Sequence, residues 1–239
     1  MPAWSKYAPV YDLVLCRTAT YQAMLDDLLG RSGWLPKMRD GAVVLDLGCG
    51  TGNLSREILA VYPRTTLIAV DRDPSMANFF REKLSFRLAD TPTAGSVFFM
   101  EVDISEAMDV LGAKGIAADY AFLVNVLFLL QEPEATLRRI ARGLKPGGEL
   151  RLSNPDEGTD LDALFDRLRL DLMEINEFQR LESEFDALKT FNKQQLLPML
   201  HRFSRDSLQH LLKHASFRKV THISHDHYRG QSILIFAIT

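Results

Sequence analysis

The sequence of 239 residues predicts an α/β protein with a mostly parallel β-sheet, helices on both faces and helical caps. From Ala42 onward, short apolar runs alternate with helix-like stretches, as in parallel sheets that are covered on both sides. Helical stripes precede the first run, and another helical segment interrupts the alternation after Asp156. The last run, 233–238, is apolar on both faces, which predicts a strand inside the sheet rather than at its edge.

Two amphipathic helices are predicted before the sheet. Each carries apolar residues at the spacing i, i+3, i+4, i+7, which places them on one helical face. The two stripes are Tyr7, Val10, Tyr11 and Val14, then Tyr21, Met24, Leu25 and Leu28. We expect residues 1–38 to form a helical lid.

Seven apolar runs predict seven strands. They are Val43–Leu47, Thr66–Val70, Val97–Val102, Tyr120–Val126, Glu149–Leu152, Lys219–Ser224 and Ser232–Ile238. Pro133 lies near the start of the helix before the fifth run, and Lys145-Pro146-Gly147-Gly148 ends that helix. We expect one domain with a core at 39–155, a helical insertion at 156–203, and a terminal helix and strand pair at 204–239.

Composition excludes several classes of protein. The net charge of -3 gives no support to nucleic-acid binding. The apolar run 120–130 is about half of the roughly 20 residues that span a bilayer. No signal peptide is visible, and two cysteines are too few for a disulfide scaffold, so a cytoplasmic protein without membrane insertion is expected. The sequence predicts no oligomeric state.

A glycine-rich turn, Gly48-Cys49-Gly50-Thr51-Gly52, connects the first strand to a helix. Glycines adopt positive φ and let the backbone pass close to a ligand. The turn therefore favours a bound nucleotide or nucleoside, although a tight strand-to-helix connection is an alternative interpretation.

Acidic residues follow the next two strands. Asp71 ends the second strand, where a carboxylate can accept hydrogen bonds from both hydroxyls of a ribose. Asp103 ends the third strand, beside the expected position of a purine, and can accept from an exocyclic amine. Each residue alone has an alternative role in a loop or helix cap, but together they predict one adenosine-shaped site.

These residues resemble the class I S-adenosylmethionine-dependent methyltransferases, whose first motif is an acidic residue, any residue, then Gly-x-Gly-x-Gly. Asp46, Gly48, Gly50 and Gly52 match it. The resemblance runs from about Ala42 to Asn154 and resumes in the final helix and strands. It implies a Rossmann-like seven-stranded sheet with an antiparallel last strand, the cofactor S-adenosyl-L-methionine and the product S-adenosyl-L-homocysteine.

The resemblance also implies roles for individual residues. Asp71 corresponds to the ribose-binding acid and Asp103 to the adenine-binding acid, while Asn125 lies beside the methionine moiety. The expected cofactor-binding residues are Asp46, Gly48, Cys49, Gly50, Gly52, Asp71, Arg72, Asp103, Ile104, Asn125 and Tyr11. The pair Tyr11-Asp12 resembles the lid helix of small-molecule members such as the quinone-biosynthesis methyltransferases, and 145–148 resembles the family's turn before the fifth strand.

Three alternative interpretations compete with this one. An NAD(P)-dependent oxidoreductase needs Gly-x-Gly-x-x-Gly, but Asn53 stands where its third glycine belongs. Methyltransferases that act on nucleobase amines have Pro-Pro after an Asn or Asp, whereas Asn125 is followed by Val126 and Leu127. A methyltransferase-fold protein that binds but transfers nothing is not distinguished by these motifs.

The expected reaction is an in-line displacement on a methyl group, with a small-molecule acceptor enclosed by aromatic side chains of the caps. These aromatics are Tyr7, Tyr11, Tyr21, Phe165, Phe178, Phe185 and Phe191. A hydroxyl acceptor needs a general base, for which His201 is the first candidate and His227 the second. No metal site is expected, because no cysteine or acidic cluster accompanies the histidines. The acceptor atom is not identified by the sequence.

Overall fold

The computed structural model describes residues 4–196, 198, 201–223 and 230–239. One seven-stranded sheet has the order β3-β2-β1-β4-β5-β7-β6. The strands are β1 (Val43–Leu47), β2 (Thr66–Val70), β3 (Val97–Met100), β4 (Ala118–Val124), β5 (Leu144–Pro155), β6 (Lys219–Ile223) and β7 (Ser232–Ile238). Strands β1 to β5 pair in parallel, whereas β7 is antiparallel to β5 and β6. The predicted mostly parallel sheet, with its last strand antiparallel and interior, is confirmed.

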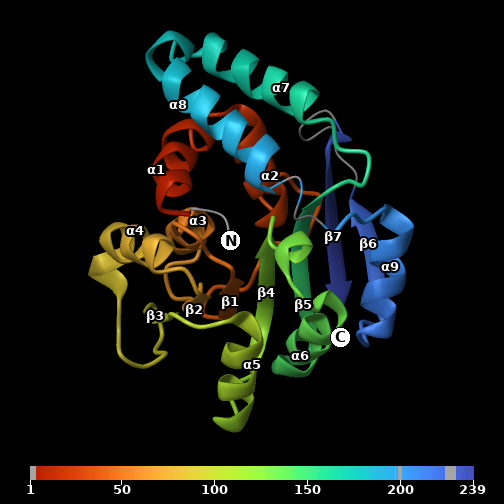
Figure 1. Ribbon diagram of the computed structural model, residues 1–239. Helices are drawn as coiled ribbons and strands as arrows, with labels where there is room; N and C mark the ends of the chain where they lie inside the picture. Colours follow the sequence, from red (N-terminus) through yellow and green to blue (C-terminus); the bar gives the residue numbers. More distant parts are fainter. Residues whose placement is uncertain (1–3, 197, 199–200, 224–229) are drawn as a thin grey trace.

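Helices cover both faces of this sheet (Figure 1). They are α1 (Trp4–Leu15), α2 (Ala19–Leu28), α3 (Asn53–Val61), α4 (Pro74–Leu84), α5 (Ile104–Ala113), α6 (Pro133–Gly143), α7 (Leu161–Glu174), α8 (Phe178–Phe191) and α9 (Arg205–His214). Apolar residues of α5, α6 and α9 form one buried cluster with the sheet. Residues of α1 to α4, α7 and α8 belong to a second cluster.

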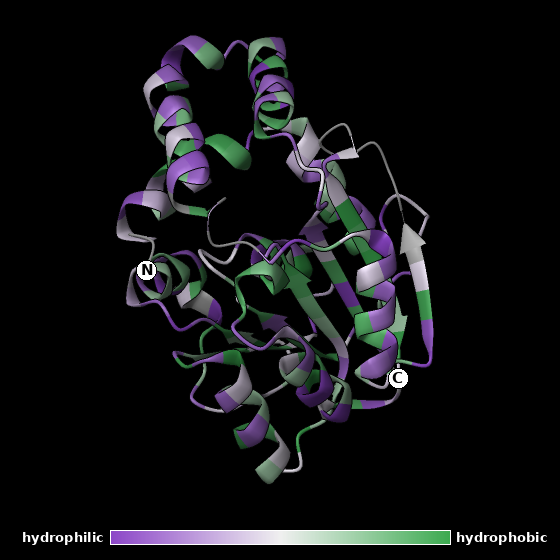
Figure 2. Ribbon diagram, turned by 45° about the vertical axis from the view of Figure 1, so that its right-hand side comes forward, coloured by the Kyte–Doolittle hydropathy of each residue, from purple (hydrophilic) through white to green (hydrophobic). Residues whose placement is uncertain are grey.

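Side chains along each central strand alternate between these two clusters. Val44 of β1 belongs to the cluster with α1 to α4, whereas its neighbour Leu45 belongs to the cluster with α5, α6 and α9. This period of two is the geometry of a pleated strand. Because both faces are covered, apolar residues dominate the central strands (Figure 2). None of the helices among the described residues is long and apolar enough to cross a lipid bilayer.

Strand β5 begins earlier than the sequence predicts. Leu144 already pairs with Ala118 of β4, and pairing resumes at Glu149 opposite Tyr120. The segment 145–148 is therefore a bulge inside the strand rather than a turn before it. Gly147 has a φ of 77° there, a value that L side chains disfavour. A Lys-Pro-Gly-Gly segment predicts a break in regular structure, but not that the ladder continues on both sides of it.

The α7–α8 hairpin and α1 lie at the end of the molecule where β4 terminates (Figure 1). Asp160 caps α7 by accepting hydrogen bonds from the backbone N–H groups of residues 162 and 163. Buried Phe165 and Leu168 of α7 and Phe185 and Leu188 of α8 give the hairpin its apolar inner face. These caps stand over the carboxyl ends of the parallel strands, where α/β proteins bind their ligands.

Helix α2, like α1, contributes to the core. Met24 and Leu25 of α2 are at most 1% exposed. The segment that follows α2 is held by Arg151 of β5, a fully buried guanidinium. Arg151 donates hydrogen bonds to the backbone oxygens of Leu28 at 2.8 Å and Pro36 at 2.9 Å, and it pairs with Glu149 at 2.7 Å. The buried charge is thus fully engaged, as its burial requires.

Candidate active site

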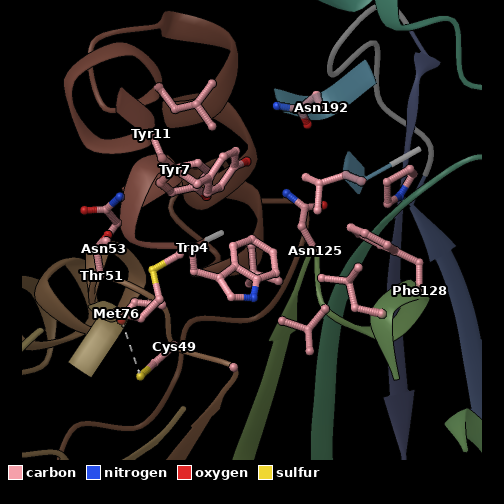
Figure 3. Close-up of a pocket in the computed structure, with 18 of the residues that line it drawn as sticks. Trp4, Tyr7, Tyr11, Cys49, Thr51, Asn53, Met76, Asn125, Phe128 and Asn192 are labelled. Carbon is pink, nitrogen blue, oxygen red and sulfur yellow. Dashed lines mark hydrogen bonds between the residues drawn. The ribbon is translucent and has the colours of Figure 1, made fainter. Parts of the chain in front are cut away.

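One cavity of about 270 Å³ lies between the strand ends and the caps. Its lower wall comes from the residues that follow β1, β2, β3 and β4. The predicted residues that line it are Tyr11, Asp46, Gly48, Cys49, Gly50, Asp71, Arg72, Asp103, Ile104 and Asn125. Gly52 of the predicted set is not among the lining residues. Figure 3 shows Cys49, Thr51 and Met76 on one side of this space, with Asn125 and Phe128 opposite.

All three glycines of the turn have positive φ, and the space for a side chain differs among the three positions. A Cβ at Gly48 would lie 2.5 Å from a methyl group of Val126, and one at Gly52 would lie 2.7 Å from the ring of Phe80. Both positions therefore need glycine for packing. At Gly50 the nearest atom to an added Cβ is Met76 Sδ, at 3.9 Å. Gly50 lines the cavity, so its missing side chain leaves room for a ligand against the backbone.

Asp71 fixes the glycine turn to the end of β2. Its Oδ2 accepts a hydrogen bond from the backbone N–H of Gly50 at 2.8 Å, and its Oδ1 accepts from that of Asp73 at 3.0 Å. Burial raises the pKa of Asp71, and these two hydrogen bonds oppose that shift. Each carboxylate oxygen has a second lone pair, so Asp71 retains acceptor capacity toward the cavity.

Asp46 lies deeper, on β1. Its Oδ2 accepts a hydrogen bond from Ser55 Oγ at 2.6 Å, and the residue is 2% exposed. Burial raises the pKa of Asp46 to about 7; the Ser55 hydrogen bond lowers it and the nearby Asp71 charge raises it. The first acidic residue of the motif is consequently a structural link between β1 and α3 that titrates near neutral pH.

Asp103 and Arg72 form the rim of the cavity. Asp103 caps α5 by accepting from the backbone N–H of Ser105 at 2.9 Å, and Arg72 Nη1 donates to its Oδ2 at 3.2 Å. Both side chains are about half exposed. The helix cap that the sequence offered as an alternative role is thus present, and it leaves the carboxylate on the cavity wall.

Asn125 follows β4 with a φ of 56°, a left-handed conformation that Asn tolerates better than most side chains. Its backbone N–H donates to the oxygen of Ser153 at 3.0 Å, and its Oδ1 accepts from Ser153 Oγ at 3.1 Å. One backbone and one side-chain hydrogen bond with Ser153 of β5 therefore hold Asn125 at the strand end.

An aromatic wall closes the side of the cavity that faces the caps. Four of the seven aromatic residues predicted for the enclosure line it, namely Tyr7, Tyr11, Tyr21 and Phe165. The other three, Phe178, Phe185 and Phe191, are not lining residues; Phe178 and Phe185 pack edge to face at 5.4 Å within the hairpin. Trp4 lines the cavity and packs on Tyr7 at 5.4 Å. The helical spacing of Trp4, Tyr7 and Tyr11 was the signal that sequence reasoning missed.

Asp12 attaches α1 to the glycine turn and was also missed as a site residue. Its Oδ1 accepts hydrogen bonds from Thr51 Oγ1 at 2.5 Å and from Asn53 Nδ2 at 2.9 Å. Its Oδ2 pairs with Lys83 Nζ of α4 at 2.8 Å, and Lys83 also donates to Asn53 Oδ1 at 2.6 Å. We call these four residues the Asp12 clasp. It holds the aromatic face of α1 over the cavity.

Of the two predicted general bases, only His201 belongs to the described residues, and it does not line the cavity. His201 is exposed and is not a lining residue; its backbone N–H donates to Phe128 at 3.0 Å, and its ring stacks on that of Phe203 at 6.1 Å. His227 lies outside the described residues. Within those residues, no histidine lines the cavity. A catalytic role for either one stays a prediction.

The strand order, the glycine turn and the two acids after β2 and β3 together define a nucleoside-binding α/β protein. Comparison with known proteins makes this more specific. Residues 17–222 match the model of a methyltransferase domain family. The chain therefore belongs to the class I S-adenosylmethionine-dependent methyltransferases, as the sequence motifs predict.

Individual relatives agree with this family. A carboxy-S-adenosyl-L-methionine synthase of Shewanella amazonensis is 32% identical over 151 residues, which are 59% of this chain and 57% of the relative. A malonyl-[acyl-carrier protein] O-methyltransferase of Halalkalibacterium halodurans is 32% identical over 143 residues, 58% of this chain and 49% of the relative. The chain thus spans about half the length of these curated relatives.

A solved structure shows the same fold. A crystal structure from Nostoc punctiforme, described as a putative O-methyltransferase, superposes with a TM-score of 0.62 at 16% identity. The match covers 100% of this chain and 62% of that one. The Rossmann-like sheet with helical caps is therefore shared, although the sequences have diverged widely.

Proposed function

We propose that this chain transfers the methyl group of S-adenosyl-L-methionine to a small organic acceptor. The observation that carries this proposal is the convergence of Gly50, Asp71 and Asp103 on one cavity beneath an aromatic wall. Family membership supports the same activity.

We also propose a cytoplasmic location, because Cys16 and Cys49 are free thiols, as expected in a reducing compartment. We propose no nucleic-acid partner, given the acidic net charge.

The residues present fit this cofactor. Asp71 has lone pairs for the ribose hydroxyls, and Gly50 leaves open space beside it. Asp103 can accept from the adenine amine, and Ile104 offers an apolar side chain next to it. Asn125 and Tyr11 would bound the methionine end. The cofactor supplies a methyl group on a sulfonium centre, which a nucleophile displaces in line.

The contribution of the chain to this reaction is alignment and enclosure. Among the described lining residues, the carboxylates of Asp71, Asp73 and Asp103 outnumber the one cation, Arg72. Asp46 adds a further partial negative charge, because its pKa is raised to about 7. This balance favours a positively charged ligand. The aromatic wall excludes water from the acceptor. Holding two reactants in line can remove roughly 7 to 11 kcal/mol of a barrier at the best-measured extreme.

A hydroxyl acceptor would also need its proton removed. We propose His201 and His227 as candidate bases for such an acceptor. His201 would have to turn from solvent toward the cavity to serve, since its side chain is exposed. Replacing each histidine by Gln tests this role. If the histidine is the general base, the variant has a lower kcat and an unchanged affinity for the cofactor; if it is not, kcat is also unchanged.

Calorimetric titration tests the cofactor assignment directly. We expect the purified chain to bind S-adenosyl-L-homocysteine and not NAD⁺, and we expect release of S-adenosyl-L-homocysteine when S-adenosyl-L-methionine and acceptors are supplied. Binding without turnover across a broad set of acceptors would favour a non-catalytic binding protein. Tight binding of NAD⁺ with none of S-adenosyl-L-homocysteine would overturn the assignment.

A further inference from the structure

The charged groups of the cavity are confined to one end. Asp46, Asp71, Arg72, Asp73 and Asp103 all belong to the strand-end segments that follow or include β1, β2 and β3. In the described part of the chain, no Lys, His, Asp or Glu lines the end between the caps, and Arg72 is the only lining Arg. An anionic acceptor would therefore meet a net negative lining whose one described cation, Arg72, lies at the strand ends and is paired with Asp103. Coulomb repulsion and desolvation would both oppose its binding.

The end between the caps is built from apolar and aromatic groups. Its walls include Trp4, Tyr7, Leu164, Phe165, Leu168 and Leu188. Tyr7 is hydrogen-bonded to Asn192, and burial raises its pKa well above the usual tyrosine value, so it stays protonated at neutral pH. Asn192 Nδ2 in turn donates to the backbone oxygen of Leu188 at 2.9 Å. Tyr7 and Asn192 are thus neutral polar groups that already have hydrogen-bond partners.

Asn125 is the exception at the boundary between the two ends. Its Oδ1 is occupied by Ser153 Oγ, and no described residue is hydrogen-bonded to its Nδ2. Figure 3 shows the amide nitrogen of Asn125 directed into the space bounded by Trp4, Tyr7 and Asn192. Asn125 is partly buried, so a ligand that displaces water from Nδ2 without offering an acceptor loses that hydrogen bond.

We propose that the methyl acceptor is an uncharged, largely apolar molecule that presents a carbonyl or hydroxyl oxygen to Asn125 Nδ2. This inference rests on the proposed methyl-transfer function and adds the substrate class. Asn125 acts as a specificity residue, because a ligand oxygen supplies the partner that the protein does not. The aromatic wall supplies the remaining affinity through burial of apolar surface.

A set of probes on one skeleton tests this class. The dissociation constants of 2-acetylnaphthalene, naphthalene, 2-naphthoate and 2-(aminomethyl)naphthalene would be measured with the full chain at saturating S-adenosyl-L-homocysteine. We expect the ketone to bind about 2- to 10-fold more tightly than naphthalene, the advantage of one neutral hydrogen bond. We expect naphthoate and the protonated amine to bind more weakly than the ketone, because the end between the caps has no charged group among the described residues to pair with either one and both would lose hydration there.

Two variants assign the ketone advantage to one atom. Asn125→Asp keeps an oxygen for Ser153 and tolerates the positive φ, but it removes the Nδ2 donor. Asn125→Gly also tolerates this φ and removes the donor without adding a charge. In both variants we expect the ketone to lose its advantage over naphthalene, while naphthalene binds as before.

Several results would overturn the proposal. They are tighter binding of naphthoate or of the amine than of the ketone, an unchanged ketone-to-naphthalene ratio in both variants, and no binding of the ketone at its solubility limit. Failure of the proposed function is distinguishable, because it appears in the preceding titration as absent binding of S-adenosyl-L-homocysteine. If the Asn125 variants lose affinity for S-adenosyl-L-homocysteine but keep the ketone advantage, Asn125 Nδ2 binds the cofactor rather than the acceptor.

Discussion

The carboxylate of Asp171, on α7, accepts a hydrogen bond from the backbone N–H of Thr20 at 2.7 Å, at the start of α2. The same carboxylate pairs with Arg167 at 3.0 Å, and Arg167 Nε donates to Thr20 Oγ1 at 3.2 Å. Asp171 is 1% exposed. A negative charge at a helix N-terminus is favourable, so this contact joins the helical insertion to the N-terminal helices. The α7–α8 hairpin is thus fixed to α2.

Asp171→Ala should lower the free energy of unfolding by about 1.5 to 3 kcal/mol, the contribution of a hydrogen bond to a charged group. Urea denaturation monitored by circular dichroism measures this change. Asp166→Ala is a matched control, because Asp166 is exposed on the same helix and its removal should change stability by less than about 0.5 kcal/mol. Equal effects of the two substitutions would contradict a coupling role for Asp171.

Asp71→Ala should weaken binding of S-adenosyl-L-homocysteine about 10- to 100-fold, because the ribose loses a charged acceptor. Calorimetric titration gives the affinity, and circular dichroism shows whether the variant is folded. Asp90→Ala, an exposed loop substitution, serves as the control and should bind normally. An unchanged affinity in a folded Asp71→Ala protein would remove the ribose assignment.

The Asp12 clasp should determine how firmly α1 is held. Without the Asp12 carboxylate, Thr51, Asn53 and Lys83 lose their common partner on α1. Hydrogen exchange of the amides in α1 should therefore accelerate in Asp12→Ala, while the strands stay protected. Lys6→Ala, on an exposed position of the same helix, should leave exchange as it is. Faster exchange throughout the sheet would show that the clasp supports the whole fold rather than α1.

Asp46 should make stability depend on pH. Burial raises its pKa from an ordinary value of 3.8 to about 7, so between these values the folded chain binds a proton that the unfolded chain has released. The contribution of this group to stability is full below the unfolded pKa and is lost as pH rises through the folded pKa. Since Asn carries no such charge, Asp46→Asn should gain stability relative to the natural chain as pH rises from about 4 to 7, by roughly a few kcal/mol.

Chemical denaturation at several pH values across this window measures the difference between the two proteins. The Asn side chain retains an oxygen for Ser55, so the local hydrogen bond is preserved in the comparison. If the two stability curves run parallel with pH, the proton uptake does not belong to Asp46.

Local sequence patterns predicted the residues at the strand ends, but they did not predict contacts between residues far apart in the sequence. Gly50, Asp71 and Asp103 were identified because a strand followed by a glycine or an acid is a short pattern whose geometry the parallel sheet dictates. Asp12 and Asp171 were not identified, because their partners are 39 to 71 and 151 positions away along the chain. Trp4 could have been predicted from helical periodicity, because it precedes Tyr7 by three positions and therefore lies on the same helical face.

The assignment of residues 1–38 as a lid illustrates the same limit. Amphipathic spacing describes α1 and α2 equally well. It indicates that one face of each helix is buried, but it does not identify what that face packs against. In the structure both helices contribute to the core, and both reach the cavity, α1 through Tyr7 and Tyr11 and α2 through Tyr21. How much of each helix faces a ligand site depends on tertiary packing, such as the contacts of Arg151 with the segment after α2.

Arg151 also links the order of synthesis to the order of folding. Its guanidinium meets carbonyl groups that precede it by 123 and 115 residues. On the ribosome, the first two helices emerge before this partner does, so these two hydrogen bonds form only after the fifth strand is made. A nascent chain that stops short of residue 151 would leave those helices unanchored and would be an early target for chaperones or proteases.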